Sequence, residues 1–198
     1  MSEMPIHAAP YRHQEEAFAF VRQLLASPQG GGAALLMEMG TGKTLTSVAI
    51  IGALWNTGRI QRLLIVAPLS ILGVWEDEFA KFAAFDYSLA VLEGTTVRKA
   101  DTIRRMNGSA LQILVVNYES AWRLEGELLK WAPELIIADE GHKLKSHNIA
   151  ASKTIHKLGA KAKCRLLLTG TVITNKPLDV FSQYKFADPS VFGGSFYL

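Results

Sequence analysis

Cysteine is almost absent from this sequence, with Cys164 alone among 198 residues. A single cysteine cannot form an internal disulfide, which excludes the disulfide-stapled secreted domains and suits a reducing compartment. Because Cys164 opens an apolar run, we expect a small core residue there rather than a nucleophile. Long apolar runs are scarce too. The longest, residues 63–75, contains Pro68, Ser70 and Gly73 and stays below the roughly 18 residues of a membrane-spanning helix, so no membrane partner is expected.

Metal-ligand spacing and a leader sequence are also missing. His7, His147 and His156 have no cysteine or carboxylate at metal-binding spacing, so we expect no zinc site. The first five residues lack the basic start and apolar run of a signal peptide, and we expect a cytoplasmic protein. The net charge of +3 is too small to argue for nucleic acid by itself. Seven Lys or Arg and no acidic residue lie between residues 141 and 165, which fits either a phosphate-handling face or a solvated helix.

The composition is that of one folded domain, expected over residues 1–198, with 49% hydrophobic and 20% charged residues. Short apolar runs alternate with helix-like stretches, which is typical of an α/β fold with a mainly parallel sheet. Runs such as 63–66 and 135–137 are apolar throughout, as strands covered by helices on both faces require. The expected strands are 33–37, 63–67, 88–92, 113–117, 135–138 and 166–169, and the expected helices are 12–26, 44–56, 71–83, 95–106, 119–131, 148–158 and 177–186.

A glycine-rich turn, residues 37–44, links the first expected strand to the next helix. Gly40 and Gly42 let backbone N–H groups point at phosphate oxygens, and the helix start adds its positive end. Lys43 would reach the β- and γ-phosphates, and the Thr44 hydroxyl would ligate Mg²⁺. The P-loop pattern has glycine where this chain has Met37, which leaves a chance match as the alternative. The predicted residues for ATP are Met39, Gly40, Thr41, Gly42, Lys43 and Thr44.

An acidic pair, Asp139-Glu140, ends another buried strand. Ligands bind at the carboxyl ends of strands in open α/β sheets, so Asp139 is placed to join Thr44 on the metal. Glu140 is the natural base or orienting group for the attacking water. A surface Asp-Glu pair is the alternative, but together with the phosphate loop the pair predicts an ATP hydrolase with Lys43, Asp139 and Glu140 as its catalytic residues.

Several segments resemble one known family. Asp139-Glu140-Gly141-His142 is similar to the DEAH/DEGH box of the second helicase superfamily. The other segments, in matching order from Tyr11 to about Gly194, resemble its Swi/Snf-type double-stranded-DNA translocases, with Val172 where that family usually has proline. These segments are 11–14, 64–79, 116–119, 168–175 and 188–193. The resemblance implies a first RecA-like lobe, that is, a P-loop domain with a mainly parallel sheet flanked by helices on both faces.

The resemblance also implies residue roles. Gln14 would read the adenine edge, since its amide offers one donor side and one acceptor side. The residues implied to couple nucleotide state to nucleic acid and to the second lobe are His142, Thr169, Gly170 and Thr171. The residues implied to lie against duplex DNA are Pro68, Leu69, Ser70, Tyr118 and Glu119. A Pro-Leu-Ser at a strand end is also ordinary helix-cap chemistry. The tryptophans are expected in the core or at a groove edge rather than in base stacking.

One part of the machinery is not recognisable in the sequence. Phosphoryl transfer needs cationic help on the γ-phosphate, which a second RecA-like lobe supplies in the resembled family. We expect that lobe in cis or in trans, and expect this chain to be a monomer with weak hydrolysis alone. The lack of large insertions between motifs favours a bacterial or phage protein, located in the cytoplasm of a bacterial or phage-infected host cell. Two alternatives stay open: an RNA or single-stranded-DNA helicase lobe, and a non-hydrolysing nucleotide-gated module, against which Lys43 and Glu140 argue together.

Overall fold

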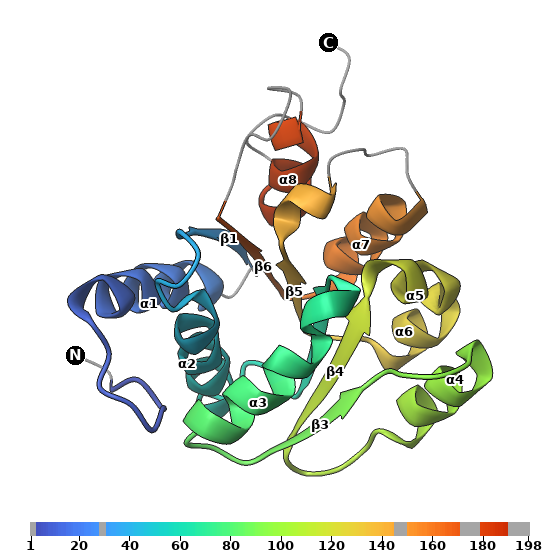
Figure 1. Ribbon diagram of the computed structural model, residues 1–198, viewed down its shortest axis with the longest axis horizontal. Coiled ribbons are helices and arrows are strands. Elements are labelled where there is room, and N and C mark those ends of the chain that lie inside the picture. Colours follow the sequence, from blue (N-terminus) through green and yellow to red (C-terminus); the bar gives the residue numbers. More distant parts are fainter. Residues whose placement is uncertain (1–2, 28–30, 145–149, 171–178, 190–198) are drawn as a thin grey trace.

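The computed structural model describes residues 3–27, 31–144, 150–170 and 179–189. Six parallel strands form one sheet in the order β1-β6-β5-β2-β4-β3 (Figure 1). The strands are β1 (Gly31–Leu36), β2 (Arg62–Ala67), β3 (Tyr87–Val91), β4 (Leu111–Asn117), β5 (Leu135–Asp139) and β6 (Cys164–Thr169). The predicted α/β class with a parallel sheet is therefore confirmed.

Helices cover both faces of this sheet, as crossover connections between parallel strands require. The α-helices are α1 (Arg12–Leu25), α2 (Lys43–Asn56), α3 (Leu72–Phe82), α4 (Thr96–Arg105), α5 (Tyr118–Arg123), α6 (Glu125–Trp131), α7 (Ala150–Lys161) and α8 (Asp179–Ala187). Two short 3₁₀ helices, η1 (Leu69–Ile71) and η2 (Gly141–Leu144), directly follow the ends of β2 and β5. Helices α1, α2 and α3 pack on one face, and α4 to α8 pack on the other (Figure 1). Within the described ranges, no helix has the length and apolarity to cross a membrane.

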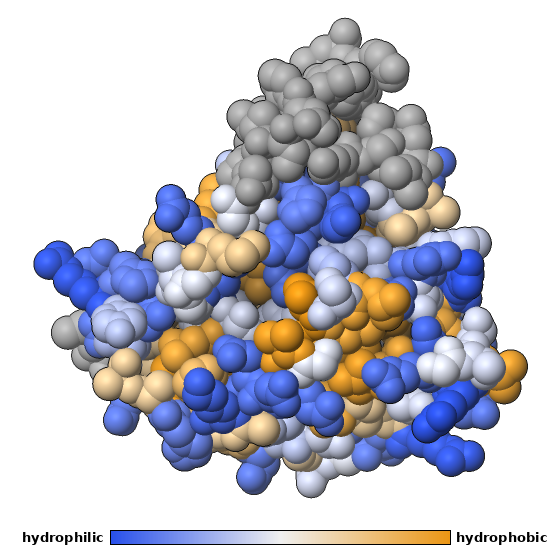
Figure 2. All heavy atoms as spheres, viewed as in Figure 1, coloured by the Kyte–Doolittle hydropathy of each residue, from blue (hydrophilic) through white to orange (hydrophobic). Residues whose placement is uncertain are grey.

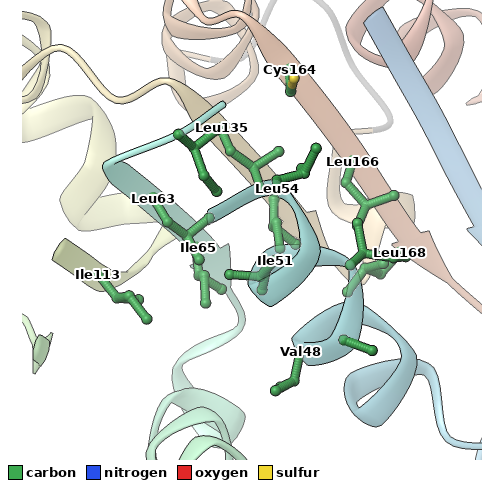
Figure 3. Packing of buried hydrophobic residues seen from close by; sticks show 14 of the residues in the cluster. Val48, Ile51, Leu54, Leu63, Ile65, Ile113, Leu135, Cys164, Leu166 and Leu168 are labelled. Atoms are coloured by element: carbon green, nitrogen blue, oxygen red, sulfur yellow. The ribbon is translucent and has the colours of Figure 1, made fainter. Parts of the chain in front are cut away.

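The strands divide their side chains between two hydrophobic cores. Leu63 and Ile65 of β2 point to the α1–α3 side, whereas Leu64 and Val66 point to the other side. Figure 3 shows the first of these cores, where α2 packs on β2, β5 and β6. All four β2 side chains are fully buried, and burying each contributes on the order of 1.5–3 kcal/mol. This two-sided burial explains why residues 63–66 of β2 are apolar at every position.

The predicted elements agree closely with the observed ones. Every strand lies within two residues of its predicted bounds, and residues 148–149 and 177–178 of two predicted helices lie outside the described residues. The helix predicted over 119–131 is divided into α5 and α6 at Leu124, whose φ of −104° and ψ of 10° interrupt the helical backbone. Leu124 is buried in the second core, and Gly126 just after it lowers helix propensity. Tertiary packing thus overrides one continuous helix.

Strand β1 makes two close backbone approaches that require glycine, at Gly31 and at Gly32, and the one at Gly32 is the tighter. A Cβ atom added to Gly32 of β1 would lie 1.6 Å from the carbonyl oxygen of Ala187 at the end of α8. We predict that Gly32→Ala lowers the free energy of unfolding by at least about 2 kcal/mol, because a backbone oxygen cannot rotate away as a side chain would. Urea denaturation would measure this change.

Gly126→Ala provides the matched control. Gly126 lies in helix α6 and is exposed, and no atom lies within 4 Å of the position that a Cβ atom would take there. Alanine there should raise the free energy of unfolding by about 0.5–1 kcal/mol. Equal stability of the two variants would contradict the close approach of β1 to α8.

Candidate nucleotide site

The carboxyl ends of the parallel strands meet at one edge of the sheet, and a cavity of about 400 Å³ lies there. One side is formed by the glycine-rich turn and the start of α2, including Gly42, Lys43 and Thr44. The other side is formed by Asp139 and Glu140 at the end of β5. Because β6 lies between β1 and β5, the turn and the acidic pair flank it from two sides. The structure therefore brings together the two sequence motifs predicted to handle the phosphates and the metal.

The glycine-rich turn has the backbone shape expected of a phosphate loop. Gly40 has φ 83° and Gly42 has φ 89°, a left-handed conformation that glycine adopts without strain. Gly42 is the N-cap residue of α2, and as a glycine it has no side chain that could accept hydrogen bonds from the first N–H groups of the helix. These N–H groups are therefore open to a ligand. Met39 and Thr41 belong to the same turn, and Met39 is one of the most exposed apolar side chains described. Met37 replaces the first glycine of the P-loop pattern, but Gly40 and Gly42, the two glycines with positive φ, are both present.

Gln14 holds the turn from the side of α1. Its side chain is only 4% exposed, its Nε2 donates to the carbonyl oxygen of Thr41 at 3.1 Å, and its Oε1 accepts from the N–H of Tyr11 at 2.9 Å. A Cβ atom on Gly42 would lie 2.2 Å from Gln14 Nε2, so glycine is also required there for this contact. His13 Nε2 lies 3.0 Å from the same Thr41 oxygen. Adenine recognition by Gln14 stays a prediction, whereas its contact with the turn is observed.

Lys43 is folded back onto the turn. Its Nζ donates to the carbonyl oxygens of Met37 at 2.8 Å and Glu38 at 3.2 Å. Gly170, at the end of β6, lies against the same place, since a Cβ atom there would be 3.4 Å from the Met37 oxygen and 3.7 Å from Lys43 Nζ. The ammonium group must leave these two carbonyls to reach a phosphate. Any side chain at residue 170 would narrow the space in which it moves.

Asp139 presents a nearly buried carboxylate to the cavity, with 7% of the residue exposed. Its Oδ2 accepts from the indole N–H of Trp75 at 3.1 Å, and its Oδ1 accepts from the backbone N–H of Glu140 at 2.8 Å. Burial raises the pKa of Asp139 above its ordinary value of 3.8, and the charge of Glu140 adds to the effect. The two hydrogen bonds and the nearby Lys43 act in the opposite direction on that pKa. The carboxylate is therefore held in place by two hydrogen bonds, with Lys43 as a nearby cation.

Glu140 occupies a strained backbone position beside it. Its φ of 51° lies in the left-handed region that residues with a Cβ seldom adopt. Its Oε2 lies 3.1 Å from Nδ1 of His142, in ion-pair range although not in hydrogen-bond geometry. Both side chains are about a quarter exposed. This arrangement turns the Glu140 carboxylate out of the sheet at the cavity and pairs it with the predicted coupling residue.

These side chains fit a magnesium ion bound with a nucleotide. Mg²⁺ prefers oxygen ligands and uses one or two protein groups together with phosphates. Asp139 and Thr44 line the same cavity, and burial raises the pKa of the Asp139 carboxyl, an effect that a bound cation would offset. Asp139 and Thr44 would hold the ion, which would neutralise phosphate charge.

The other coupling residues adjoin the turn. Thr169 is fully buried and is paired with Leu36 in the β1–β6 register, and its carbonyl oxygen accepts from the N–H of Met37. Gly170 follows it directly against Lys43. The predicted coupling residue Thr171, and Val172 with it, lie outside the described residues.

The two segments predicted to touch DNA lie side by side. Ala67 of β2 is paired with Asn117 of β4, so Pro68–Ser70 and Tyr118–Glu119 both start at this edge of the sheet. Leu69 and Ser70 are exposed, and Figure 2 shows apolar side chains gathered over the start of α3 in the middle of this face. Glu119 is exposed and forms an ion pair with Arg123 of α5. DNA contact by these residues stays a prediction.

Tyr118 is directed inward instead. Its hydroxyl donates to the backbone oxygen of Asp139 at 2.7 Å. Burial, together with the carboxylates of Asp139 and Glu140, raises the pKa of Tyr118 well above its ordinary value of 10.0, so the hydroxyl keeps its proton. Neither this bond nor the one from Trp75 was predicted. A general signal existed, since a buried indole N–H needs an acceptor and Asp139 was the carboxylate expected at a buried strand end.

A second cavity lies at the opposite, amino end of the strands. It has about 540 Å³ and is lined by Arg62, Arg104 and Gln112 among others. Arg104 is already paired with Asp101 and Glu127. Two lysines of the basic run between residues 141 and 165 are also paired with carboxylates, Lys157 with Glu125 and Lys163 with Glu134. The nucleotide site is assigned to the carboxyl edge because both motifs lie there.

Fold and site together define the class of protein. An all-parallel RecA-like sheet with a phosphate loop after one strand and an acidic pair after another is a P-loop ATPase lobe of helicase type. Residues 13–196 match the family model described as SNF2-related domain, and the chain belongs to this family. The predicted family resemblance is thereby confirmed.

Similar curated proteins include DNA repair and recombination protein RAD54-like of Drosophila ananassae, which is 33% identical over 196 residues. That match covers 91% of this chain and 24% of the relative. Probable ATP-dependent DNA helicase CHR23 of Arabidopsis thaliana is 35% identical over 156 residues, covering 78% of this chain and 14% of the relative. The chain thus spans a quarter or less of the length of these relatives.

Solved structures agree with this family. The Sulfolobus solfataricus SWI2/SNF2 ATPase core in complex with dsDNA matches with a TM-score of 0.81 and 27% identity. The match covers 98% of this chain and 39% of that one. The S. solfataricus SWI2/SNF2 ATPase core domain matches with a TM-score of 0.77 and 26% identity. The predicted RecA-like fold is confirmed over nearly the whole chain.

The strained backbone at Glu140 gives a prediction for stability. We predict that Glu140→Gly is about 1 kcal/mol more stable than Glu140→Ala, because both remove the carboxylate but glycine alone is free of the left-handed penalty. Thermal or urea unfolding of the pair measures the difference. The same pair of changes at Glu76, in helix α3, should give the reverse order, since alanine is favoured within a helix. The same sign at both positions would show that Glu140 is not strained.

Proposed function

We propose that this chain is the ATP-binding lobe of an ATP-dependent motor that acts on double-stranded DNA. The observation that supports it most is the convergence of the phosphate loop, the acidic pair and the two predicted DNA segments on one edge of the sheet. The family supports it as well, because a SWI2/SNF2 core was solved with dsDNA and the curated relatives are named for DNA repair and DNA helicase activity. The chain covers a quarter or less of those relatives, so the activity of a complete motor is part of this proposal.

The residues of the lobe would divide the work of hydrolysis. The N–H groups of the turn and the positive start of α2 bind the phosphates, and Lys43 exchanges its two carbonyl partners for phosphate oxygens. Asp139 and Thr44 would hold Mg²⁺, and Glu140 would orient or deprotonate the attacking water. His142, 3.1 Å from Glu140, senses whether that carboxylate is in place. Hydrolysis yields ADP and phosphate.

A second RecA-like lobe, in cis or in trans, would complete this site. Phosphoryl transfer needs a cation on the γ-phosphate, and in this lobe Lys43 is the cation that lines the cavity with the acidic pair. Met39, Leu69 and Val74 are exposed apolar side chains of the turn, η1 and α3. An apolar rim around the cavity suits coverage by another domain. We propose that the lobe alone is a monomer that hydrolyses ATP slowly.

The first test is steady-state phosphate release from Mg-ATP by the 198-residue chain alone, with duplex DNA and with RNA. We predict release close to that of Lys43→Ala in every condition, because the γ-phosphate lacks the cation of the second lobe. Nucleotide binding, followed with a fluorescent ATP analogue, should still weaken about tenfold or more in Lys43→Ala. Glu140→Gln should bind as tightly as the wild type.

The outcomes separate the candidate functions. Strong stimulation by duplex DNA that Lys43→Ala abolishes would establish the DNA motor and contradict the need for a second lobe. Stimulation by RNA or single-stranded DNA alone would favour the helicase alternative. Unchanged partner binding by Glu140→Gln in a complete complex that retains its biological activity would favour the non-hydrolysing module.

Magnesium binding should depend on pH through Asp139. Its carboxyl must be deprotonated to ligate the ion, and burial raises its pKa above the ordinary 3.8. The contribution of Asp139 to Mg²⁺-dependent nucleotide affinity is therefore constant well above this raised pKa. It falls by up to about tenfold per pH unit once the pH drops below it, sooner than for an exposed aspartate. The measurement is a Mg²⁺ titration with fluorescent nucleotide between about pH 8 and pH 4.5.

Asp139→Asn is the control for this profile. The nucleotide phosphates titrate in both proteins, so the difference between the two profiles isolates Asp139. The variant should show weak Mg²⁺ dependence at every pH. Identical profiles for wild type and variant would contradict the assignment of Asp139 to the metal.

A further inference from the structure

Two hydrogen bonds converge on Asp139 from separate parts of the fold. Trp75 of α3 donates its indole N–H to Oδ2, and Tyr118 of α5 donates its hydroxyl to the backbone oxygen. Trp75 is 1% exposed and Tyr118 is half-buried. Each of the two donors contacts a different part of the same residue. One restrains the metal-binding carboxylate, and the other restrains the strand end that carries it.

Each donor is joined to a segment predicted to lie against DNA. Helix α3 follows η1 without a break, so Trp75 is only five residues beyond Ser70. Tyr118 is itself the first residue of α5, next to Glu119. The two segments also start from register-paired residues of β2 and β4, which fixes them relative to each other. A shift of either segment against a DNA backbone would change the position of a donor to Asp139.

We propose that Trp75 and Tyr118 are positioning residues through which duplex DNA, bound at the two segments, sets the geometry of Asp139 and thereby the affinity of the lobe for Mg²⁺-nucleotide. The inference rests on the proposed function, since it requires the two segments to bind DNA. It assigns neither residue to catalysis, because neither contacts phosphate. In this proposal the coupling between DNA and nucleotide runs through the hydrogen bonds from Trp75 and Tyr118 to Asp139, within the lobe itself.

The quantity to measure is the coupling factor, the ratio of the dissociation constants for Mg²⁺–AMPPNP without and with saturating duplex DNA. Thermodynamic linkage makes this factor equal for both ligands, so DNA affinity with and without nucleotide gives an independent value. We expect about fivefold or more for the wild-type chain, the lower range of measured allosteric coupling. The factor should return to one when EDTA removes Mg²⁺, because Asp139 acts through the metal.

Trp75→Phe and Tyr118→Phe each remove one donor and keep an aromatic ring. Each should lower the coupling factor toward one. The factor is measured at saturating duplex DNA for each variant, so a change in duplex affinity alone does not alter it. The double variant should lose little more than the stronger single one, as expected for two groups that act on one residue. Tyr118→Phe keeps the test valid if Trp75→Phe leaves a cavity that prevents folding.

The chain offers matched controls for both changes. Trp131 is also a buried tryptophan, and its indole N–H donates to the oxygen of Met106, away from the nucleotide site. Tyr87 lies among aromatic rings on β3, and among the described residues no hydrogen bond is assigned to its hydroxyl. Trp131→Phe and Tyr87→Phe should keep the wild-type coupling factor, whatever they do to stability.

The outcomes distinguish this inference from the proposed function. A chain that binds no duplex DNA would overturn the proposed function, and this inference with it. Duplex binding with a coupling factor of one would overturn the inference alone. A wild-type factor that survives in both Trp75→Phe and Tyr118→Phe, or that the control variants lose equally, would overturn it too.

Discussion

Burial of a parallel sheet on both faces is the constraint from which the site follows. With helices on each side, the central strands must be apolar, and residues 63–67 of β2 and 135–138 of β5 are fully buried. Parallel strands can be joined only by crossovers, so all carboxyl ends reach the same edge. Polar groups are then excluded from the layer and appear where the strands stop. The phosphate loop after β1, the acidic pair after β5 and Gly170 after β6 are therefore neighbours although they are far apart in the sequence.

Placing an acidic residue at such a buried strand end carries a cost that the fold only partly offsets. Desolvation raises the pKa of Asp139, and two N–H donors stabilise its charged form without supplying a full positive charge. The next residue, Glu140, adopts a left-handed backbone to turn its carboxylate toward the cavity. Backbone strain and a desolvated carboxylate at adjacent residues are typical of sites selected for function rather than stability. A bound Mg²⁺ would relieve the electrostatic part of this cost.

Much of this arrangement could be predicted from the sequence, because it depends on patterns with a fixed physical meaning. Short, mostly apolar runs located all six strands, and strand–turn–helix context located Lys43 despite Met37 in place of glycine. The division of one helix at Leu124 could not be predicted, since it depends on what packs against that residue. Nor could the contacts of Trp75 and Tyr118 with Asp139, which join residues 64 and 21 positions apart. Local pattern identifies which residues carry chemistry, whereas long-range packing decides what holds them.

The position of Lys43 shows how such a lobe would limit its own activity. Its ammonium group is bonded to two carbonyl oxygens of the turn, which satisfies the charge locally. A phosphate must replace both bonds, so the net gain from binding is the difference between two charge-assisted interactions rather than the whole of one. Gly170 keeps this exchange sterically possible from β6, the strand between the turn and the acidic pair. Under the proposed function, this competition would weaken nucleotide binding by a single lobe. Closure by a second lobe would then add contacts made only with the nucleotide in place.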